Sequence, residues 1–262
     1  MNTKELISTI WSKKSMLCVG LDTAAEKLPH GFSKDAKGML AFNKEIIEAT
    51  KDIAVSYKLN TAFYEALGVD GWKLMEETRA LLPDHTFNIA DAKRGDIGNT
   101  SKMYAKAFFD TLDFDALTVA PYMGEDSVAP FLEFKDKVTI VLGLTSNKGS
   151  IDFQTNASYS PPLYETVLRT VSQWGDSSSL MFVIGATKAN MLEHIRKIIP
   201  DHFLLIPGVG AQGGNIGEVI KANSDGPAII NVSRGIIYAS NENDYLEKIR
   251  EKAIYYRDAF RG

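Results

Sequence analysis

Short apolar runs alternate with amphipathic stretches along most of the chain. The runs are rich in β-branched residues and end in polar or glycine residues, which is typical of parallel strands buried on both faces. They predict eight strands, at residues 16–22, 54–60, 86–93, 116–121, 138–145, 180–186, 203–208 and 228–233. Between them, apolar residues such as Phe42 and Ile46 recur at spacings of three and four, which predicts helices. Asn99, Thr100 or Ser101 is expected to N-cap the helix that follows the third strand.

Eight alternations of strand and helix within 262 residues match the (β/α)8 barrel, or TIM barrel, among the α/β folds. The main rival is a doubly wound open sheet, but no GxGxxG motif follows the first predicted strand. No repeat, low-complexity segment or linker divides the chain, so residues 1–262 are expected to form one domain. The one long irregular stretch, residues 147–162, leaves the end of the fifth strand and is expected to be an active-site loop.

Composition is that of an ordinary soluble globular protein, with 45% hydrophobic and 24% charged residues. A net charge of −4 argues against a nucleic-acid binder that works by bulk charge. Residues 1–16 lack the apolar region of a signal peptide, and no stretch approaches the length of a membrane span. Cys18 is the only cysteine, so no internal disulfide can form and a reducing compartment is expected. These features predict a cytoplasmic protein with no membrane or nucleic-acid partner.

A cluster of opposite charges follows the third apolar run. Asp91, Lys93, Arg94 and Asp96 fall within six residues. Asp91 and Lys93 are two residues apart, so on a regular strand they point to the same face. Asp96 comes after Gly95, where the strand is expected to have ended. Charges placed in this way are costly unless they serve each other or a ligand.

In a barrel, polar residues at the carboxyl ends of the strands share one mouth. The residues at or just beyond such ends are Asp22, Lys58, Asp91, Lys93, Ser146, Gln212 and Arg234. Single members have ordinary alternatives: Asp22 could cap the next segment, Lys58 could be a surface lysine, and Ser146 could be a loop serine. The convergence of all seven is the stronger indication of a site.

Two glycine-containing loops indicate a phosphate site. PGVGAQGG at residues 207–214 follows the seventh strand, and SRG at residues 233–235 follows the eighth. Barrels often bind phosphate at these two loops, through backbone N–H groups exposed by glycines. Arg234 can add a bidentate contact and Gln212 an amide donor. The alternative is that the glycines only make tight turns. The four histidines have no metal-ligand spacing, and no GxSxG elbow is present, so neither a metal nor a serine nucleophile is expected.

The motifs VGLD, SYKLN, DAKRGDIGNT, LTSN, PGVGAQGG and SRGI together resemble the orotidine 5′-phosphate decarboxylase family. They match in order from Asp22 to Ile236, and their spacing resembles the branch with longer loops after strands one and five. The resemblance implies a TIM barrel that converts orotidine 5′-phosphate to uridine 5′-phosphate in de novo pyrimidine biosynthesis. It also implies that no cofactor is used and that the protein is a homodimer with active sites at the subunit interface.

The same resemblance assigns roles to residues. Lys58, Asp91, Lys93 and Asp96 resemble the family's catalytic charge array, in which the last Asp comes from the partner subunit. Asp96 and Thr100 would therefore complete the neighbouring site.

The remaining roles concern the substrate. Asp22 and Lys58 resemble ligands of the ribose hydroxyls, and Ser146 resembles the residue that binds the pyrimidine. Gln212 and Arg234 resemble the phosphate grip, with Gly213 and Gly235 beside them. Many relatives carry Pro where this chain has Lys148, a departure in the loop after strand five that leaves the charge array unchanged.

The implied chemistry is demanding, because loss of CO₂ from C6 leaves a carbanion in an orbital orthogonal to the ring π system. Preorganised electrostatics would have to stabilise it, with the Lys93 ammonium facing the anion and then protonating C6. Asp91 and Asp96 would keep Lys93 charged despite burial.

Two alternatives stay open. The sugar-phosphate branch of the suprafamily shares DxKxxD but uses Mg²⁺, and the AQGG and LTSN motifs fit it poorly. A catalytically silent nucleotide-binding barrel is the other, and the intact charge array argues against it.

Overall fold

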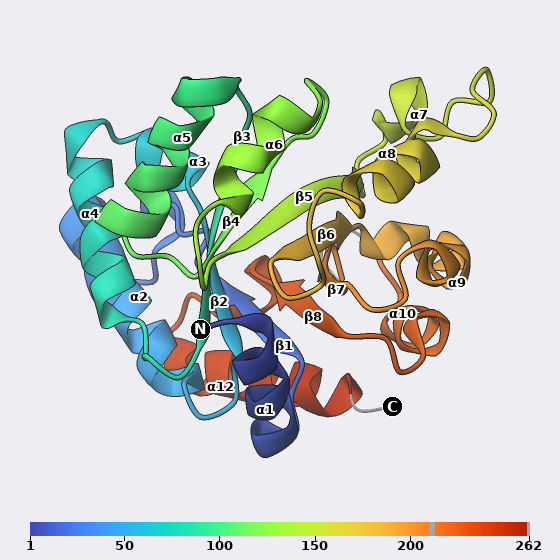
Figure 1. Ribbon diagram of the computed structural model, residues 1–262. Helices are drawn as coiled ribbons and strands as arrows, with labels where there is room; N and C mark the ends of the chain where they lie inside the picture. Colours follow the sequence, from blue (N-terminus) through green and yellow to red (C-terminus); the bar gives the residue numbers. More distant parts are fainter. Residues whose placement is uncertain (210–212, 261–262) are drawn as a thin grey trace.

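Eight parallel strands close into a barrel in the computed structural model, which describes residues 1–209 and 213–260 (Figure 1). Each strand pairs with its neighbours in sequence, and β8 returns to pair with β1. The strands are β1 (Leu17–Gly20), β2 (Ser56–Asn60), β3 (Phe87–Arg94), β4 (Ala116–Val119), β5 (Val138–Leu144), β6 (Leu180–Ile184), β7 (Phe203–Pro207) and β8 (Ala228–Val232). This order confirms the predicted TIM barrel, and the alternative of a doubly wound open sheet is wrong.

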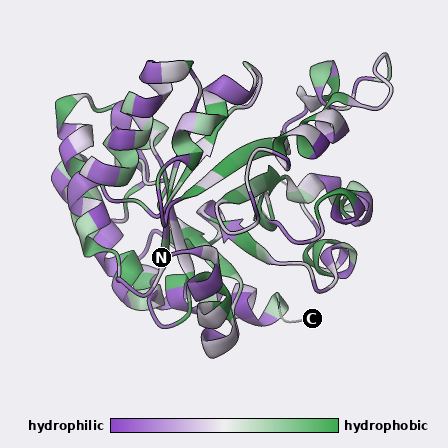
Figure 2. Ribbon diagram, in the orientation of Figure 1, coloured by the Kyte–Doolittle hydropathy of each residue, from purple (hydrophilic) through white to green (hydrophobic). Residues whose placement is uncertain are grey.

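Helices surround the barrel, with their apolar faces toward the strands (Figure 2). They are α1 (Thr3–Lys13), α2 (Ala36–Thr50), α3 (Ala62–Glu65), α4 (Val69–Leu81), α5 (Gly98–Lys106), α6 (Glu125–Leu132), α7 (Ser150–Phe153), α8 (Leu163–Val171), α9 (Ala189–Ile198), α10 (Ile216–Asn223), α11 (Arg234–Ile237) and α12 (Tyr245–Ala259). Short turns of other helix types are η1 (Ala25–Lys27), η2 (Ala107–Thr111) and η3 (Ala186–Lys188). In α2, Met39, Phe42 and Ile46 are buried, as their spacing predicts.

The apolar core divides into two clusters because successive strand residues point to opposite faces. Leu17 and Val19 of β1 belong to the cluster between barrel and helices, whereas Cys18 between them belongs to the smaller inner cluster. Leu6 of α1 joins the inner cluster. Helix α1 therefore closes the amino-terminal end of the barrel, and the carboxyl ends of the strands are left to form a site.

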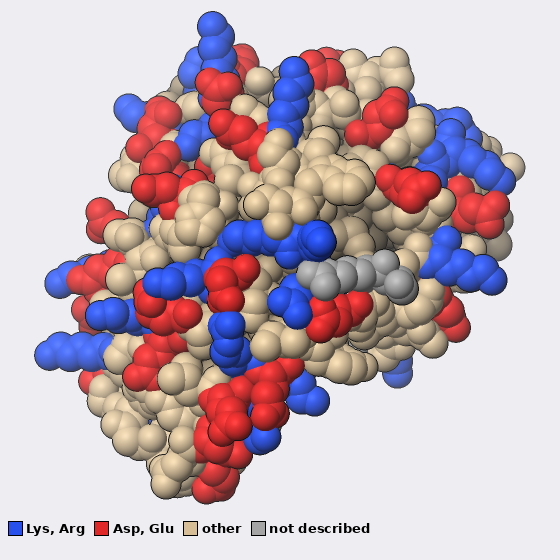
Figure 3. Space-filling view, turned by 90° about the horizontal axis from the view of Figure 1, so that it is seen from below, with Lys and Arg blue, Asp and Glu red and all other residues tan. Residues whose placement is uncertain are grey.

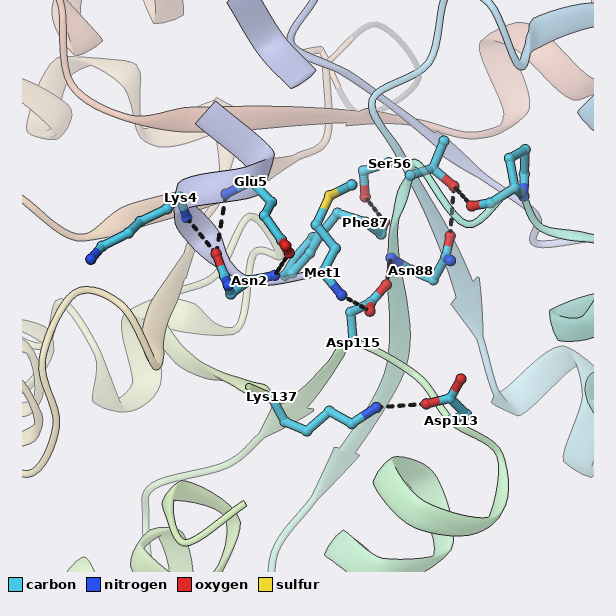
Figure 4. Close-up of polar contacts among 12 residues, drawn as sticks. Met1, Asn2, Lys4, Glu5, Ser56, Phe87, Asn88, Asp113, Asp115 and Lys137 are labelled. Carbon is cyan, nitrogen blue, oxygen red and sulfur yellow. Dashed lines mark hydrogen bonds and ion pairs between the residues drawn. The ribbon is translucent and has the colours of Figure 1, made fainter. Parts of the chain in front are cut away.

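Polar groups at the closed end are paired with one another (Figure 4). The backbone N–H of Asn88 donates to Oδ2 of Asp115 at 2.8 Å, and the amino group of Met1 pairs with Oδ1 of the same carboxylate. Asn2 caps α1 by accepting from the N–H of Glu5 at 3.1 Å. This end of the barrel is fastened by hydrogen bonds that lie on the opposite side from the predicted site residues.

The predicted cap of the helix after β3 is wrong. Asn99, Thr100 and Ser101 all lie within the first turn of α5, and Ile97 occupies the cap position with no side-chain hydrogen bond. The reason is visible at Ser101, whose hydroxyl donates to the backbone carbonyl of Asp96 at 2.6 Å. That hydroxyl is directed to a carbonyl of the preceding turn instead of accepting from a helix N–H.

The stretch 147–162 leaves the end of β5 as predicted, but it is not wholly irregular because it contains α7. The backbone N–H of Thr145 donates to Oε1 of Gln154 at 2.8 Å, so this stretch folds back onto the strand end.

The surface mixes charges of both signs. On the face drawn in Figure 3, Lys and Arg side chains are interspersed with Asp and Glu. No helix in the described ranges has the length and apolar character needed to cross a membrane.

Candidate active site

A cavity of about 410 Å³ opens at the carboxyl ends of the strands. Six of the predicted residues line it: Asp22, Lys58, Asp91, Lys93, Ser146 and Arg234. They come from the ends of β1, β2, β3, β5 and β8, which are far apart in sequence and adjacent only because the barrel closes. A cavity of this size suits a small-molecule ligand.

Three charged side chains form a chain of ion pairs along one wall of the cavity. Nζ of Lys58 lies 3.0 Å from Oδ2 of Asp91 and 3.5 Å from Oδ1 of Asp22. Nζ of Lys93 lies 2.5 Å from Oδ1 of Asp91. The Asp91 carboxylate therefore uses one oxygen for each lysine, and this sharing fixes its orientation between them.

The ion pairs hold their charges in the folded protein. Burial alone would lower the pKa of Lys58, but the carboxylates of Asp22 and Asp91 outweigh it and raise that pKa above its ordinary value. Burial likewise opposes ionisation of Asp91, yet Lys58 and Lys93 hold the pKa of its carboxyl well below the usual range. Lys58 is only 3% exposed, which excludes the reading of it as a surface lysine.

Lys93 reaches this arrangement through a β-bulge. Ala90 pairs with Leu117 of β4, and the next pair is Arg94 with Val119, so residues 91–93 face a single residue of β4. Lys93 itself has a φ of 46°, in the left-handed region that non-glycine residues seldom adopt. The predicted proximity of Asp91 and Lys93 is confirmed, but regular strand alternation does not produce it.

The prediction that Lys93 is buried is wrong for the single subunit, in which its side chain is 49% exposed. The bulge places it beyond the regular part of β3, at the mouth of the cavity, where solvent reaches it.

The other end of the cavity holds Arg234, at the start of α11 directly after β8. Val209 and Gly214 form an isolated bridge that draws together the two ends of the loop after β7. Gln212 lies outside the described residues. Gly213, with a φ of 84°, does not line the cavity, and neither does Gly235, where an added Cβ would lie 2.8 Å from the hydroxyl of Tyr256.

Asp96 and Thr100 do not line the cavity of their own chain either. Oδ1 of Asp96 accepts from the N–H of Ile97 at 2.8 Å, and Thr100 is exposed in the first turn of α5. Their predicted contribution to the site of a partner subunit stays a prediction.

Four further cavity residues, Pro207, Gly208, Val209 and Ser233, belong to the two loops predicted to bind phosphate. The cavity residues that the sequence predictions did not assign to the site are Asn60, Leu142, Thr145, Asn147, Val183, Leu205 and Asn231. Most lie at strand ends next to predicted residues. The expectation that the carboxyl ends of the strands share one mouth could therefore have identified them. Among the described residues, no group of three or more His, Cys, Asp or Glu side chains is arranged to hold a metal ion.

Arg94, the remaining member of the charged cluster, faces away from the cavity. Its guanidinium pairs with Glu65 of α3 and lies 5.4 Å from the ring centre of Tyr104 and 5.3 Å from that of Phe108. It therefore fastens the end of β3 to the neighbouring helices.

Comparison with known proteins agrees with this geometry. The model of the orotidine 5′-phosphate decarboxylase / HUMPS family matches residues 15–249. The orotidine 5′-phosphate decarboxylase of Christiangramia forsetii is 54% identical over 259 residues, covering 97% of this chain and 95% of the relative. The orotidine 5′-phosphate decarboxylase of Bacteroides fragilis strain YCH46 is 51% identical, and the match covers 97% of this chain and 94% of the relative.

Solved structures give the same picture. The OMP decarboxylase of Leishmania donovani is 34% identical with a TM-score of 0.83, covering 98% of this chain and all (100%) of the other. The orotidine 5′-monophosphate decarboxylase of Methanocaldococcus jannaschii is 22% identical with a TM-score of 0.71, and the match covers 93% of this chain and 97% of the other. At this identity the similarity shows the fold alone. The similarity to the Leishmania protein over its whole length agrees with the predicted longer-loop branch of the family. The chain belongs to the orotidine 5′-phosphate decarboxylase / HUMPS family.

Proposed function

We propose that this chain decarboxylates orotidine 5′-phosphate to uridine 5′-phosphate in the synthesis of UMP, without a cofactor. The observation that carries the proposal is the pairing of Lys58, Asp91 and Lys93 along one wall of a cavity that has Arg234 at its other end. Family membership and the curated relatives support the reaction. The charged wall suits a reaction that develops negative charge, and Arg234 suits a phosphate.

The substrate would lie across the cavity. Arg234, with Gln212 and the glycine-containing loops, would bind the phosphate, and Asp22 and Lys58 would bind the ribose hydroxyls. Ser146, at the end of β5, would bind the pyrimidine. These contacts would place C6 of the ring next to Lys93.

The chemical step follows from that placement. The C6–CO₂ bond breaks, its electron pair stays on C6, and Lys93 then donates a proton there. One contact between unit charges at ~4 Å and an effective dielectric of ~20 is worth roughly 4 kcal/mol. Large enzymatic barrier reductions reach ~20 kcal/mol, so the charge contact of Lys93 would account for only part of the reduction. Repulsion between Asp91 and the substrate carboxylate, and binding energy from the phosphate, would supply the rest.

A homodimer with shared sites is part of the proposal. Ile97 is 54% exposed, and Met103 of α5 is 50% exposed. Phe63 of α3 and Met123, before α6, are also exposed. Helices α3, α5 and α6 lie on the same side of the barrel (Figure 1), and an apolar surface there would suit a partner that receives Asp96 and Thr100.

The proposal also includes a single domain over residues 1–262 and a cytoplasmic location. The lone, fully buried Cys18 fits a reducing compartment.

The decisive experiment follows the absorbance of orotidine 5′-phosphate with purified protein and excess EDTA. Loss of substrate absorbance with formation of uridine 5′-phosphate is expected. A strict requirement for a divalent metal, with turnover of a ketose phosphate, would instead select the sugar-phosphate branch. Binding of uridine 5′-phosphate without any decarboxylation would establish a silent nucleotide-binding protein.

A further inference from the structure

The hydroxyl of Thr118 links the two residues at the centre of the charged wall. Thr118 lies on β4 as the single residue opposite the bulge of β3. Its Oγ1 donates to Oδ1 of Asp91 at 3.0 Å and accepts from the backbone N–H of Lys93 at 2.9 Å. One hydroxyl group has one proton to donate and lone pairs to accept, so both bonds can form together.

The bulge explains why this hydroxyl matters. In a regular ladder the N–H of Lys93 would point to β2, the side on which the carbonyl of Asp91 accepts from the N–H of Thr61. The bulge turns this N–H toward β4, with which residues 91–93 form no ladder pairs. Thr118 supplies the missing acceptor from its side chain. It also stabilises Lys93 in its left-handed conformation, which is otherwise unfavourable.

Thr118 is itself held firmly. Its backbone pairs in register with Ile140 of β5, and the residue is only 1% exposed. If the hydroxyl were removed, water could therefore hardly enter to take over its two hydrogen bonds. An unsatisfied N–H and a carboxylate with one donor fewer would remain in a partly enclosed site.

We infer that Thr118 is a positioning residue, which sets the relative placement of Asp91 and Lys93 through its hydroxyl without contacting the substrate. The inference rests on the proposed function and adds to it a residue that does not line the cavity. Because the substrate-binding contacts lie elsewhere, loss of the hydroxyl should affect turnover much more than binding.

The test compares Thr118→Val, which replaces the hydroxyl by a methyl group, with Thr118→Ser, which keeps it. We expect kcat of the Val variant to fall roughly 10- to 100-fold, as for loss of a hydrogen bond to a charged group. KM and the Kd for uridine 5′-phosphate should stay within about threefold of wild type, and the Ser variant should keep most of kcat.

A matched control is available on the next strand. Thr139 of β5 is also 1% exposed, and its hydroxyl has no hydrogen-bond partner among the described residues. Thr139→Val makes the same chemical change at a similar depth without touching Asp91 or Lys93. Its kcat should equal that of wild type.

Three outcomes would overturn the inference: wild-type kcat in Thr118→Val, equal losses in the Val and Ser variants, or an equal loss in Thr139→Val. If Thr118→Val does not fold, Thr118→Ala replaces it in the comparison with Thr118→Ser. A wild-type chain that does not decarboxylate would refute the proposed function instead. In that case hydrogen exchange of the Lys93 backbone amide tests the role of Thr118 by itself. Exchange should be slow in wild type and in Thr118→Ser and fast in Thr118→Val.

Discussion

The Nζ atom of Lys93 lies 2.5 Å from Oδ1 of Asp91, although the two residues are separated by only one position in a bulged strand. This contact directs the ammonium group along the charged wall and leaves it half-exposed at the mouth. A cation held there can act on a substrate atom without first moving.

Replacement of Lys93 by Ala should therefore nearly abolish turnover. A loss of at least about 1,000-fold in kcat is expected from a charge contact of roughly 4 kcal/mol. Binding of uridine 5′-phosphate, measured by calorimetry, should persist because Arg234 and Asp22 remain. Lys73→Ala is a suitable control, since Lys73 is 72% exposed on α4. A kcat like that of wild type in Lys93→Ala would exclude the proposed mechanism.

Mixing two inactive variants tests the shared site. Lys93→Ala and Asp96→Ala should each be nearly inactive alone. After random subunit exchange of equal amounts, about one site in four should contain both residues, so activity should return. Native mass spectrometry would verify that mixed dimers have formed. If verified mixed dimers stay inactive, Asp96 acts within its own subunit.

Gly185 is expected to be essential for the position of Ser146. A Cβ added to Gly185 would lie 2.6 Å from the backbone nitrogen of Ser146, so the loop after β5 would have to shift. Gly185→Ala should lower the free energy of unfolding by about 1–3 kcal/mol and raise KM for orotidine 5′-phosphate.

Urea denaturation and steady-state kinetics would measure both effects. Gly217→Ala in α10 is the control, because the nearest atom to its added Cβ is 3.5 Å away. That substitution should raise stability by about 0.5–1 kcal/mol. Equal behaviour of the two variants would contradict the steric explanation.

Cys18 should make stability fall in alkaline solution. Burial raises the pKa of its thiol to about 12, whereas an unfolded cysteine titrates near ~8.5. Between these values the folded state retains a proton that the unfolded state has lost. The stabilisation is thus complete below pH ~8.5 and decreases by up to about 1.4 kcal/mol per pH unit above it.

Urea denaturation at pH 8 and pH 10 would show this loss. The Cys18→Ala variant should lose less stability over the same interval, and an identical loss in both proteins would show that other groups are responsible. In the native protein at pH 8, the thiol should react with a disulfide reagent only as fast as the chain opens.

The barrel and most of the cavity were predictable from the sequence because both depend on simple periodicity. Continuous apolar runs identify buried parallel strands, and barrel closure brings their polar ends together, as for Lys58 and Arg234. The role of Thr118 was not predictable, since nothing in ALTVAP shows that β3 bulges opposite it. The cap of α5 was missed for a related reason: the direction of the Ser101 hydroxyl depends on where the backbone of Asp96 lies in three dimensions.

The bulge in β3 also limits how this protein can change over time. Point substitutions at residues 91–93 would alter single groups. Insertion or deletion of one residue there would change the direction of the Lys93 side chain and the pairing of Arg94 with Val119 of β4. The loops on the rim have no such restriction, because their lengths do not set strand register. Natural variation in length among homologues should therefore be found in the rim loops and be absent from β3.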